Sequence, residues 1–399
     1  MSQAYGQNQV LLVAAYPSVD KLITAAIPVW QRMHPDVEIK LVSRSFSDHH
    51  TAMITALSTS TNVPDVMAVE VSYMGRFLAG TGLQDLTQKP FDIKDVQSKF
   101  APFAFDQATG ASGAVGGVPT DIGPGTLLYR TDLLKKAGVT EEELTRSWDS
   151  FVAAGRTIKA KTGAYLVANA NDIKDIVIRS NIKPGDGIYF DAAGDVIVDS
   201  PRFVRAFELA RKVRLEKLDG RIGAWSNEWA QGFKNGTIAN QMSGAWLVAH
   251  MSKWLAPNTK GLWRATQLPE NSWAAWGGNF FAIPRNAKNK TLAWEFIQLM
   301  TLSRDVQLDG FKTQDAFPAL LEAHADKYFE QPIEFLGGQK ARNVWRDAAL
   351  KVKAIKVNKL DPIADEIINT ELDKVLNQGK DIPTALADAK KLLARRVRH

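Results

Sequence analysis

The sequence predicts two α/β domains, each with a mixed, mostly parallel sheet flanked by helices. A chain of 399 residues is too long for one ordinary core and fits two domains of about 150 to 200 residues each. Near the N-terminus, short apolar segments alternate with amphipathic ones, the pattern of a parallel sheet with crossover helices. A Gly- and Pro-rich segment at residues 115–125 interrupts that pattern and predicts the first crossing into a second domain.

The first domain opens with a strand, a helix and a second strand. Residues 9–16 are an apolar run that ends before Pro17, which predicts a buried strand. Apolar side chains recur at helical spacing over residues 18–34, and residues 37–42 then form the second strand. The alternation continues with a helix at 50–59, a strand at 64–69 and a helix at 73–80. Ligands of such folds bind at loops after strands, here residues 16–20, 44–49 and 70–73.

The second domain is predicted to begin after the crossing, with a strand at 126–129. We expect its helices at residues 130–137, 147–161, 201–217 and 227–235, and a hairpin around an Asx and Gly turn at 189–198. A Gly-containing strand at 277–284 and a helix at 291–300 return the chain to the first domain, and a helical region at 342–398 caps the second. The predicted domains are residues 1–120 plus 280–328, and 121–279 plus 329–399.

Composition excludes several classes of protein. The chain has no cysteine, which excludes thiol catalysis and disulfides. Its net charge of +6 is small and dispersed, so we expect no nucleic-acid partner. No Walker loop, dinucleotide fingerprint or G-x-S-x-G elbow occurs, and we expect neither a cofactor nor an enzyme.

Two groups of residues invite a metal interpretation, and neither has the required spacing. His49 and His50 are adjacent, so on a strand their side chains would diverge. Asp186, Asp191 and Asp195 lack the twelve-residue calcium-loop pattern, and a hairpin turn explains them better. We therefore predict no metal site.

No apolar run reaches the length of a membrane span. The apolar stretch at residues 10–16 is also too short for a signal peptide and lacks basic flanks. If the protein is exported, we expect the leader to be already absent from the numbered chain, with Met1 placed before the mature sequence.

Five segments, in this order, resemble one known family. They are His34-Pro35-Asp36-Val37 after the helix at 27–33; Pro64-Asp65-Val66 with Gly-Leu-Gln-Asp-Leu at 82–86; Val118-Pro119 leading through 128–138; Phe233 to Trp246; and Gly277-Gly278 with Ile283-Pro284 and the Ala-Trp-Glu-Phe of 293–296. Asn240 stands where the family usually has Met. The set is similar to the extracellular solute-binding proteins of sugar-type ABC importers, the family that includes maltose-binding protein.

The resemblance implies a fold and a function. It implies the two-lobe periplasmic-binding-protein fold of type II, with a ligand cleft between lobes that close by hinge motion. The implied ligand is a carbohydrate, from a monosaccharide to an oligosaccharide or glycoside, and the implied partner is the membrane permease of an ABC importer. A monomer in the periplasm or outside the cell is expected.

Tryptophans are concentrated in one part of the chain. Seven of the eleven lie between Trp225 and Trp276, and indole rings match the C–H faces of sugars. We expect Trp225, Trp246 and Trp276 to contact ligand. Trp254, Trp263 and Trp294 are expected to be packing residues instead.

Sugar hydroxyls also need polar partners, which the loops after strands supply. The predicted ligand-binding residues besides the tryptophans are Tyr16, Arg44, Ser45, His49, Glu70, Asp121, Gly278, Asn279 and Arg342. Structural roles remain open for some of them. Asp121 could order the crossing through an Asx turn, Glu70 could pair with Arg76, and Gly277 and Gly278 could form a tight bend. Ser47 or Asp48 could cap the helix that follows residues 44–49.

Two alternative functions remain open at this point. Arg44, Lys183, Arg342 and Arg346 could recognise an anionic sugar derivative such as an acidic or sulfonated glycoside. Glu70 and Asp121 could be the acid and base of a glycoside hydrolase, because paired carboxylates in a Trp-rich cleft suit that chemistry.

Overall fold

The computed structural model describes residues 9–353 and 355–397 and divides the chain into two compact units. Unit 1 contains the described residues up to Ile122, with Gly277–His324 and Val357–Lys359. Unit 2 contains the described residues of Gly123–Trp276, Ala325–Lys356 and the chain from Leu360 onward. The expectation about Met1 and the end of the helix predicted to reach residue 398 lie outside the described residues.

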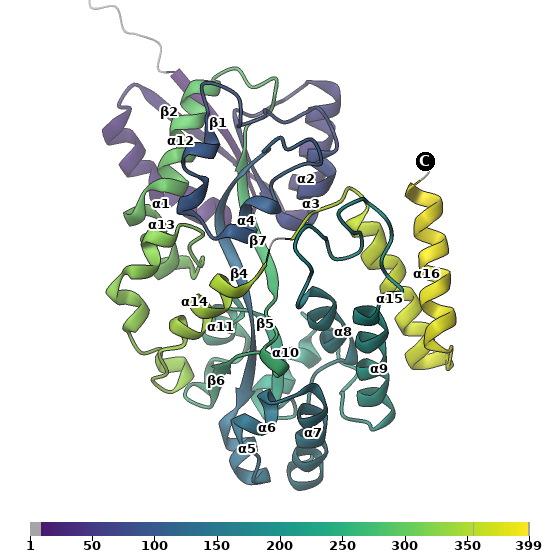
Figure 1. The fold of residues 1–399 in the computed structure, drawn as a ribbon. Coiled ribbons are helices and arrows are strands. Elements are labelled where there is room, and N and C mark those ends of the chain that lie inside the picture. The colour runs from purple at the N-terminus through teal and green to yellow at the C-terminus, as the bar shows by residue number, and fades with distance from the viewer. Residues whose placement is uncertain (1–8, 354, 398–399) are drawn as a thin grey trace, which may run out of the picture. The chain divides into compact units, whose positions relative to one another are not determined.

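Unit 1 is built on a mixed sheet with the strand order β2-β1-β3-β7 (Figure 1). β1 (Gln9–Ala15) pairs in parallel with β2 (Val37–Ser43) and with β3 (Val66–Glu70). β3 pairs antiparallel with β7 (Ala275–Ala282), which places Glu70 opposite Asn279. The strand, helix, strand opening predicted from the sequence is confirmed.

Helices cover both faces of this sheet. α2 (Phe46–Thr59) and α3 (Val71–Leu78) pack on one face, where Met53, Met74 and Phe77 join Met67 and Val69 in one apolar cluster. The helices α1 (Val19–Met33), α12 (Lys290–Leu302) and α13 (Arg304–Gln314) contact one another and lie on the opposite side (Figure 1). A short helix, α4 (Pro102–Asp106), completes this unit.

Unit 2 has a sheet whose strand pairings are antiparallel. β4 (Val118–Arg130), which begins in unit 1, pairs with β5 (Asn240–Gly244) and with β6 (Trp263–Thr266). Two isolated parallel bridges, Tyr165 to Ile238 and Val167 to Asp219, lie outside these strands, so the sheet of β4, β5 and β6 is antiparallel. It differs from the mostly parallel sheet predicted for each domain, because β5 and β6 return alongside β4 in the opposite direction.

The helices of unit 2 enclose a second, larger apolar core. α9 packs against α8, α15 and α16, and α5 and α6 pack against α7. The helices are α5 (Thr131–Ala137), α6 (Glu141–Thr145), α7 (Trp148–Thr162), α8 (Ala170–Arg179), α9 (Pro201–Leu215), α10 (Asn227–Asn235), α11 (Leu247–His250), α14 (Ala341–Lys351), α15 (Asp361–Gln378) and α16 (Ile382–Val397). A π-helical turn, Met251–Leu255, continues α11.

Two local predictions need correction. The Gly- and Pro-rich segment before residue 126 is not a loop but part of the 13-residue strand β4. The hairpin predicted at 189–198 is reduced to a single bridge between Phe190 and Val196, because the Asp191 carboxylate accepts the N–H groups of Ala193 and Asp195 and forms a tight turn.

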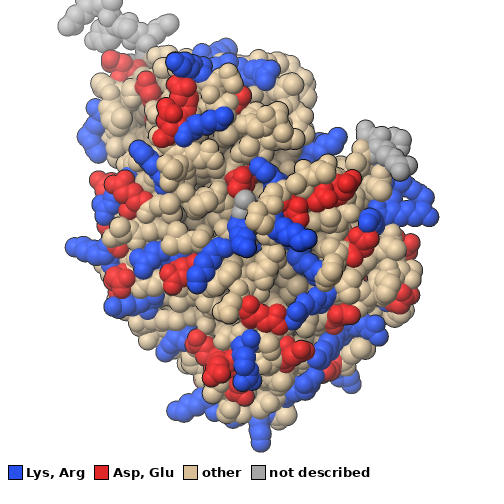
Figure 2. Space-filling view, viewed as in Figure 1, with Lys and Arg blue, Asp and Glu red and all other residues tan. Residues whose placement is uncertain are grey.

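Basic and acidic side chains are interspersed on the face of the molecule drawn in Figure 2, without a single-sign patch. Among the described residues, no helix is both long and apolar enough to span a membrane.

Candidate functional site

Four of the predicted site residues of unit 1 come from four neighbouring strands. Tyr16 directly follows β1, Glu70 ends β3, Asn279 lies in β7 and Asp121 lies in β4. Because the strand order runs β1-β3-β7-β4, these residues lie in a row across four neighbouring strands. The sequence predicted Tyr16, Glu70 and Asn279 within or just after strands and Asp121 in the crossing before residue 126. The structure brings Tyr16, Asp121 and Asn279 into direct contact.

Asn279 joins Tyr16 to Asp121. The Tyr16 hydroxyl donates to Asn279 Oδ1 at 2.5 Å, and Asn279 Nδ2 donates to both carboxylate oxygens of Asp121 at 2.7 and 2.9 Å. The backbone N–H of Asn279 also donates to Asp121 Oδ1, at 2.8 Å. Asp121 therefore ties β4 to β7 and does not form the Asx turn considered for it.

Burial shifts the pKa values of the ionisable ends of this network. Burial raises the pKa of the Asp121 carboxyl to about 6, although the hydrogen bonds from Asn279 act in the opposite direction. Burial, together with the negative charges of Glu70 and Asp121, holds the pKa of the Tyr16 phenol well above its usual range. Tyr16 is therefore a neutral donor at physiological pH, and Asp121 changes charge in mildly acidic solution.

Glu70 caps a helix. Its carboxylate accepts the backbone N–H of Ser72 at 2.8 Å and the Ser72 hydroxyl, at the N-terminus of α3. Its backbone N–H donates to His50 Nε2 at 3.2 Å, while His50 Nδ1 lies 2.8 Å from the Phe46 carbonyl oxygen. His50 must therefore be neutral, with its proton on Nδ1, and burial lowers its pKa to about 4.

The loop after β2 contributes exposed and buried residues. Arg44 and Ser45 are exposed, and Ser45 is the N-cap of α2, with its hydroxyl accepting the Asp48 N–H at 3.3 Å. The capping residue is thus Ser45, not Ser47 or Asp48 as the sequence suggested. His49 is fully buried and bonds through Nε2 to the Ala68 carbonyl at 2.7 Å, so its ring lies beneath Tyr16 and does not face solvent.

Gly278 has a backbone conformation that suits only glycine. Its φ is 139°, and an added Cβ would lie 3.3 Å from the Asp121 carbonyl oxygen. The sequence predicted two roles for Gly278, an accessible backbone for ligand and a tight bend. The positive φ and the close approach to Asp121 support the tight bend.

Two of the three predicted tryptophans of unit 2, Trp225 and Trp246, form an aromatic array with Trp254. The rings of Trp225 and Trp246 are nearly parallel, 12° apart in plane, with centroids 6.0 Å apart. Trp225 also contacts Trp254, at 6.3 Å and 24°, and both lie around His250. Flat apolar faces of this kind suit the C–H surfaces of sugar rings.

Trp246 is anchored by its neighbours. Its indole Nε1 donates to the Trp276 carbonyl oxygen at 2.9 Å, which links α11 to β7. Gly244 leaves the space that this bond needs, because a Cβ there would lie 2.3 Å from Trp246 Nε1 and 2.8 Å from the Trp276 oxygen.

The ring of Trp276 has a cation beside it. The Arg179 guanidinium lies 5.0 Å from the ring centroid, and Arg179 Nη1 donates to the Asp175 carbonyl at 3.0 Å and carboxylate at 3.3 Å. Arg179 was not among the predicted site residues, because α8 itself was not predicted.

The prediction that Trp254 is a packing residue is wrong. It was expected to pack in a core, but it is 54% exposed, whereas Trp263 and Trp294 are buried as predicted. A signal was present: Trp246, His250 and Trp254 are spaced four residues apart, which places them on one helical face.

Arg342 is held within unit 2. Its guanidinium lies 3.8 Å from the Tyr328 ring centroid and donates to the Gln331 carbonyl at 3.0 Å and the Tyr328 hydroxyl at 2.8 Å. Only 8% of the residue is exposed. These bonds occupy the side chain that the sequence offered as a ligand contact.

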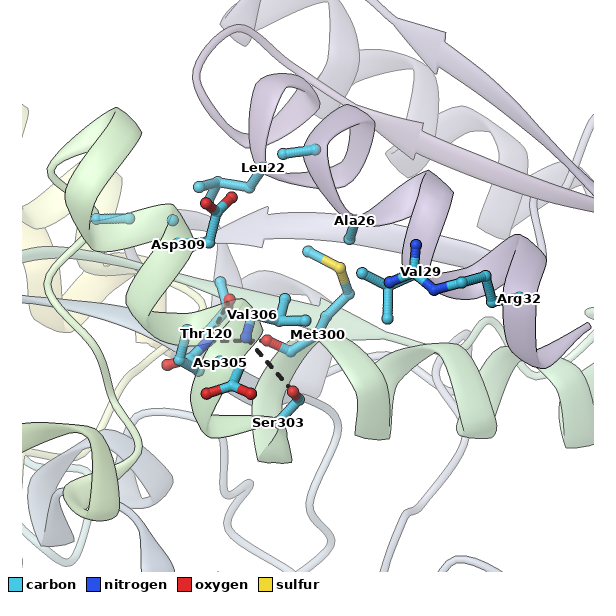
Figure 3. Close-up of a pocket in the computed structure, with 14 residues that line it drawn as sticks. Leu22, Ala26, Val29, Arg32, Thr120, Met300, Ser303, Asp305, Val306 and Asp309 are labelled. Atoms are coloured by element: carbon cyan, nitrogen blue, oxygen red, sulfur yellow. Dashed lines mark hydrogen bonds between the residues drawn. The ribbon is translucent and has the colours of Figure 1, made fainter.

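Unit 1 also contains a cavity of about 460 Å³ between α1, α12 and α13 (Figure 3). Leu22, Ala26 and Val29 line it from α1, and Gln307 lies against it, with Nε2 donating to the Met300 carbonyl at 2.8 Å. No predicted site residue and no aromatic ring lines this cavity, so it does not belong to the aromatic array.

No group of His, Asp and Glu side chains that could hold a metal ion occurs among residues 9–353 and 355–397. Both ring nitrogens of His50 are engaged, and His49 Nε2 bonds to a backbone carbonyl.

Comparisons with known proteins agree with the motifs in the sequence. Residues 12–306 match the model of the bacterial extracellular solute-binding protein family. A lactose-binding protein of Rhizobium radiobacter is 26% identical over 377 residues, covering 87% of this chain and 85% of that protein. An arabinooligosaccharide-binding protein of Bacillus subtilis is 27% identical over 283 residues, covering 67% of this chain and 63% of that protein.

A solved structure shows the same fold. A family 1 extracellular solute-binding protein superimposes with a TM-score of 0.85 at 21% identity, covering 98% of this chain and all of that one. The predicted α/β fold class and the predicted family resemblance are confirmed. This protein belongs to the family of bacterial extracellular solute-binding proteins.

Proposed function

We propose that this protein binds a carbohydrate, from a monosaccharide to an oligosaccharide or glycoside, and delivers it to an ABC importer. The observation that carries the proposal is the aromatic array in which Trp225 stacks on Trp246, and Trp246 is anchored to Trp276. Indole faces suit the C–H surfaces of sugars, and the relatives named for lactose and arabinooligosaccharides support the ligand class.

The polar contacts are proposed to come from Tyr16, Glu70, Asp121 and Asn279. Their hydroxyl, carboxylate and amide groups can exchange hydrogen bonds with sugar hydroxyls, and Arg44 and Ser45 lie exposed in a neighbouring loop. His49 supports Tyr16 from beneath. Backbone groups at Gly278 remain proposed ligand contacts.

A binding role accounts for the two carboxylates better than hydrolysis does. Glu70 accepts hydrogen bonds at the N-terminus of α3, and Asp121 accepts three from Asn279, so each carboxylate is held in place as an acceptor that can take a further hydrogen bond from a sugar hydroxyl. Arg342 and Arg346, which could have recognised an anionic sugar, are engaged with Tyr328 and Asn343 in their own unit. We therefore propose a neutral carbohydrate and no catalytic activity.

The remaining proposals concern the cellular setting. We propose a monomer in the periplasm or outside the cell, with the permease of an ABC importer as partner. We also propose lobes of residues 1–120 plus 280–328 and 121–279 plus 329–399, which the compact units support. Hinge closure of these lobes on ligand stays a prediction.

A thermal-shift panel tests the function. Cellobiose, lactose, maltose, arabinooligosaccharides, polyols and acidic glycosides are each added to the purified protein, and an aryl glycoside is incubated with it separately. We expect at least one neutral sugar to raise the melting temperature and no aryl alcohol to be released. A shift with peptides or amino acids alone, or turnover of the aryl glycoside, would overturn the proposal.

A further inference from the structure

Trp225 combines an exposed ring with an unusual backbone conformation. Its φ is 66°, in the left-handed region, and 54% of the residue is exposed. Bulky residues rarely adopt this conformation, and such outliers concentrate at ligand clamps and switch regions. The position of Trp225 therefore calls for a functional explanation.

Stacking holds the Trp225 ring in place. Trp246 lies nearly parallel to it and Trp254 contacts it at a small angle, while Trp229 lies 5.2 Å away at 53°. In the part of the chain that the structure describes, neither the backbone N–H nor the indole N–H of Trp225 donates a hydrogen bond. The ring can thus leave Trp246 without breaking a hydrogen bond of its own.

The segment that carries Trp225 is short, and its hydrogen bonds lie at its two ends. Residues 223–225 are exposed, with Gly223 at their start, and no heavy atom lies within 4 Å of a Cβ added there. The fixed points lie on either side: Ile222 donates its N–H to the Ala168 carbonyl at 2.9 Å, and Ser226 is the N-cap of α10. Within the segment, the Gly223 carbonyl accepts the Ser226 N–H at 3.4 Å and the Ser226 hydroxyl at 2.8 Å, so rotation of the Trp225 side chain is the movement that leaves all these bonds intact.

Trp246, in contrast, is fixed. It lies two residues after the end of β5, and its Nε1 donates to the Trp276 carbonyl. The backbone of Gly244 packs directly against that bond, so the Trp246 ring has no room to move there. The pair consists of one rigid ring and one movable ring, already aligned within 12°.

We propose that Trp225 and Trp246 form a clamp that opens to take one sugar ring between their two parallel faces. This deepens the proposed carbohydrate function and rests on it. Carbon atoms in contact lie roughly 3.5 to 4 Å apart, so a sugar with an indole on each side needs the planes separated by roughly twice that distance. Because the rings are already nearly parallel, Trp225 needs only to move away from Trp246.

The clamp also defines a class of ligand. A sugar ring held between two indoles must present C–H groups on both faces. The clamp therefore favours a pyranose whose hydroxyls lie near the ring plane, since an axial hydroxyl would point into one indole and lose its hydration.

Exciton-coupled circular dichroism tests the clamp directly, because two stacked indoles give a far-ultraviolet couplet that depends on their separation. The measurement compares Trp254→Phe with the double variant Trp254→Phe/Trp246→Phe, because Trp229 also lies 5.2 Å from Trp225, and the difference between the two spectra isolates the Trp225 and Trp246 couplet. The sugar of the thermal-shift panel with the largest effect is added to saturation. We expect the couplet to be present in the free protein and to weaken on binding.

Affinity provides the second readout. Trp225→Ala should weaken binding of that sugar about tenfold, because it removes one face of the clamp. Trp225→Phe keeps a flat ring and should stay within about threefold of wild type. An unchanged couplet at saturation, or wild-type affinity in Trp225→Ala, would overturn the clamp while saturable binding upheld the carbohydrate function. If no sugar binds the wild-type protein, both proposals fail.

Discussion

Asn279 presents both its backbone N–H and its side-chain amide to the carboxylate of Asp121, at distances of 2.7 to 2.9 Å. The same side chain accepts the Tyr16 hydroxyl, so one residue of β7 connects the end of β1 to β4. A buried polar network of this kind is stable only when each member has a partner.

Asn279→Ala should therefore lower both stability and ligand affinity. The substitution leaves the Tyr16 hydroxyl and the Asp121 carboxylate without their partner, which costs about 1 to 3 kcal/mol of unfolding free energy. Urea unfolding and sugar titration measure the two effects. Asn258→Ala, at an exposed asparagine, is the matched control and should change neither; equal effects of the two substitutions would contradict the role assigned to the network.

Asp121 should make the free energy of unfolding fall as the pH rises. Its folded-state pKa of about 6 exceeds the value of about 3.9 in an unfolded chain, so the folded state binds the proton more tightly. The stabilising contribution is complete below about pH 4 and is lost as the pH rises through about 6, with a total of about 1 to 3 kcal/mol. The free energies of unfolding of wild type and Asp121→Asn, measured from pH 4 to 7, should depend differently on pH. The same pH dependence in both proteins would contradict this prediction.

His50 should make the free energy of unfolding fall as the pH drops. Its folded-state pKa of about 4 lies below the unfolded value of about 6.5, because burial and the neighbouring His49 disfavour the charged ring, while the bond to the Phe46 carbonyl acts in the opposite direction. Its contribution is complete above about pH 6.5 and falls as the pH drops toward 4, by about 3 kcal/mol in all. His50→Gln should be less sensitive to acid in the same unfolding series. A wild-type acid sensitivity in that variant would show that other groups dominate.

Trp246→Ala and Trp276→Ala should each weaken sugar binding without unfolding the protein. Trp246→Ala removes an indole face from the aromatic array, and Trp276→Ala removes the separate indole that lies beside Arg179. Loss of such a ring costs about 1.5 to 3 kcal/mol of binding free energy. Calorimetric titration gives the affinities, and circular dichroism verifies the fold. Trp263→Phe, in the core of unit 2, is the control that should lower stability and leave affinity unchanged. Full affinity in both alanine variants would remove the array from the site.

Gly244→Ala tests how the array is held. The new methyl group would press on Trp246 Nε1 and the Trp276 carbonyl, so the bond between these residues must break or β5 must shift. We expect weaker sugar binding and an altered near-ultraviolet tryptophan spectrum. Gly110→Ala has only ordinary contacts at 3.7 to 3.8 Å and should behave like wild type in both measurements.

The sequence predicted much of unit 1 because its local patterns agree with its tertiary structure. The apolar run before Pro17, the stop at Pro35 and the alternation at 37–42 each correspond to an observed boundary. The strand β4 was harder, because Pro119 and Pro124 read as loop residues, whereas long-range pairing incorporates them into the strand. α8 was missed although Asn169 and Asp172 form a capping box at its start.

The candidate site was only partly accessible to sequence reasoning. Predicted strands and the loops next to them located Tyr16 and Asn279, and the Gly- and Pro-rich crossing located Asp121. Periodicity could not reveal that one asparagine would join the other two, because that contact spans 263 and 158 residues of sequence. Trp254 was misjudged although its four-residue spacing from His250 and Trp246 was visible, because that spacing does not tell whether a helical face is buried or exposed.

The most direct test of the carbohydrate assignment is an equilibrium titration of the wild-type protein with the sugar that gives the largest thermal shift. Binding is monitored through tryptophan fluorescence. A ligand at a hundredfold excess over its Kd stabilises the bound fold by about 2.7 kcal/mol, so the titration and the thermal shift must agree. We predict saturable binding with a fluorescence change that Trp246→Ala abolishes, and recovery of the sugar chemically unchanged. Absence of binding by every sugar, together with saturable binding of a peptide or amino acid, would contradict the assignment.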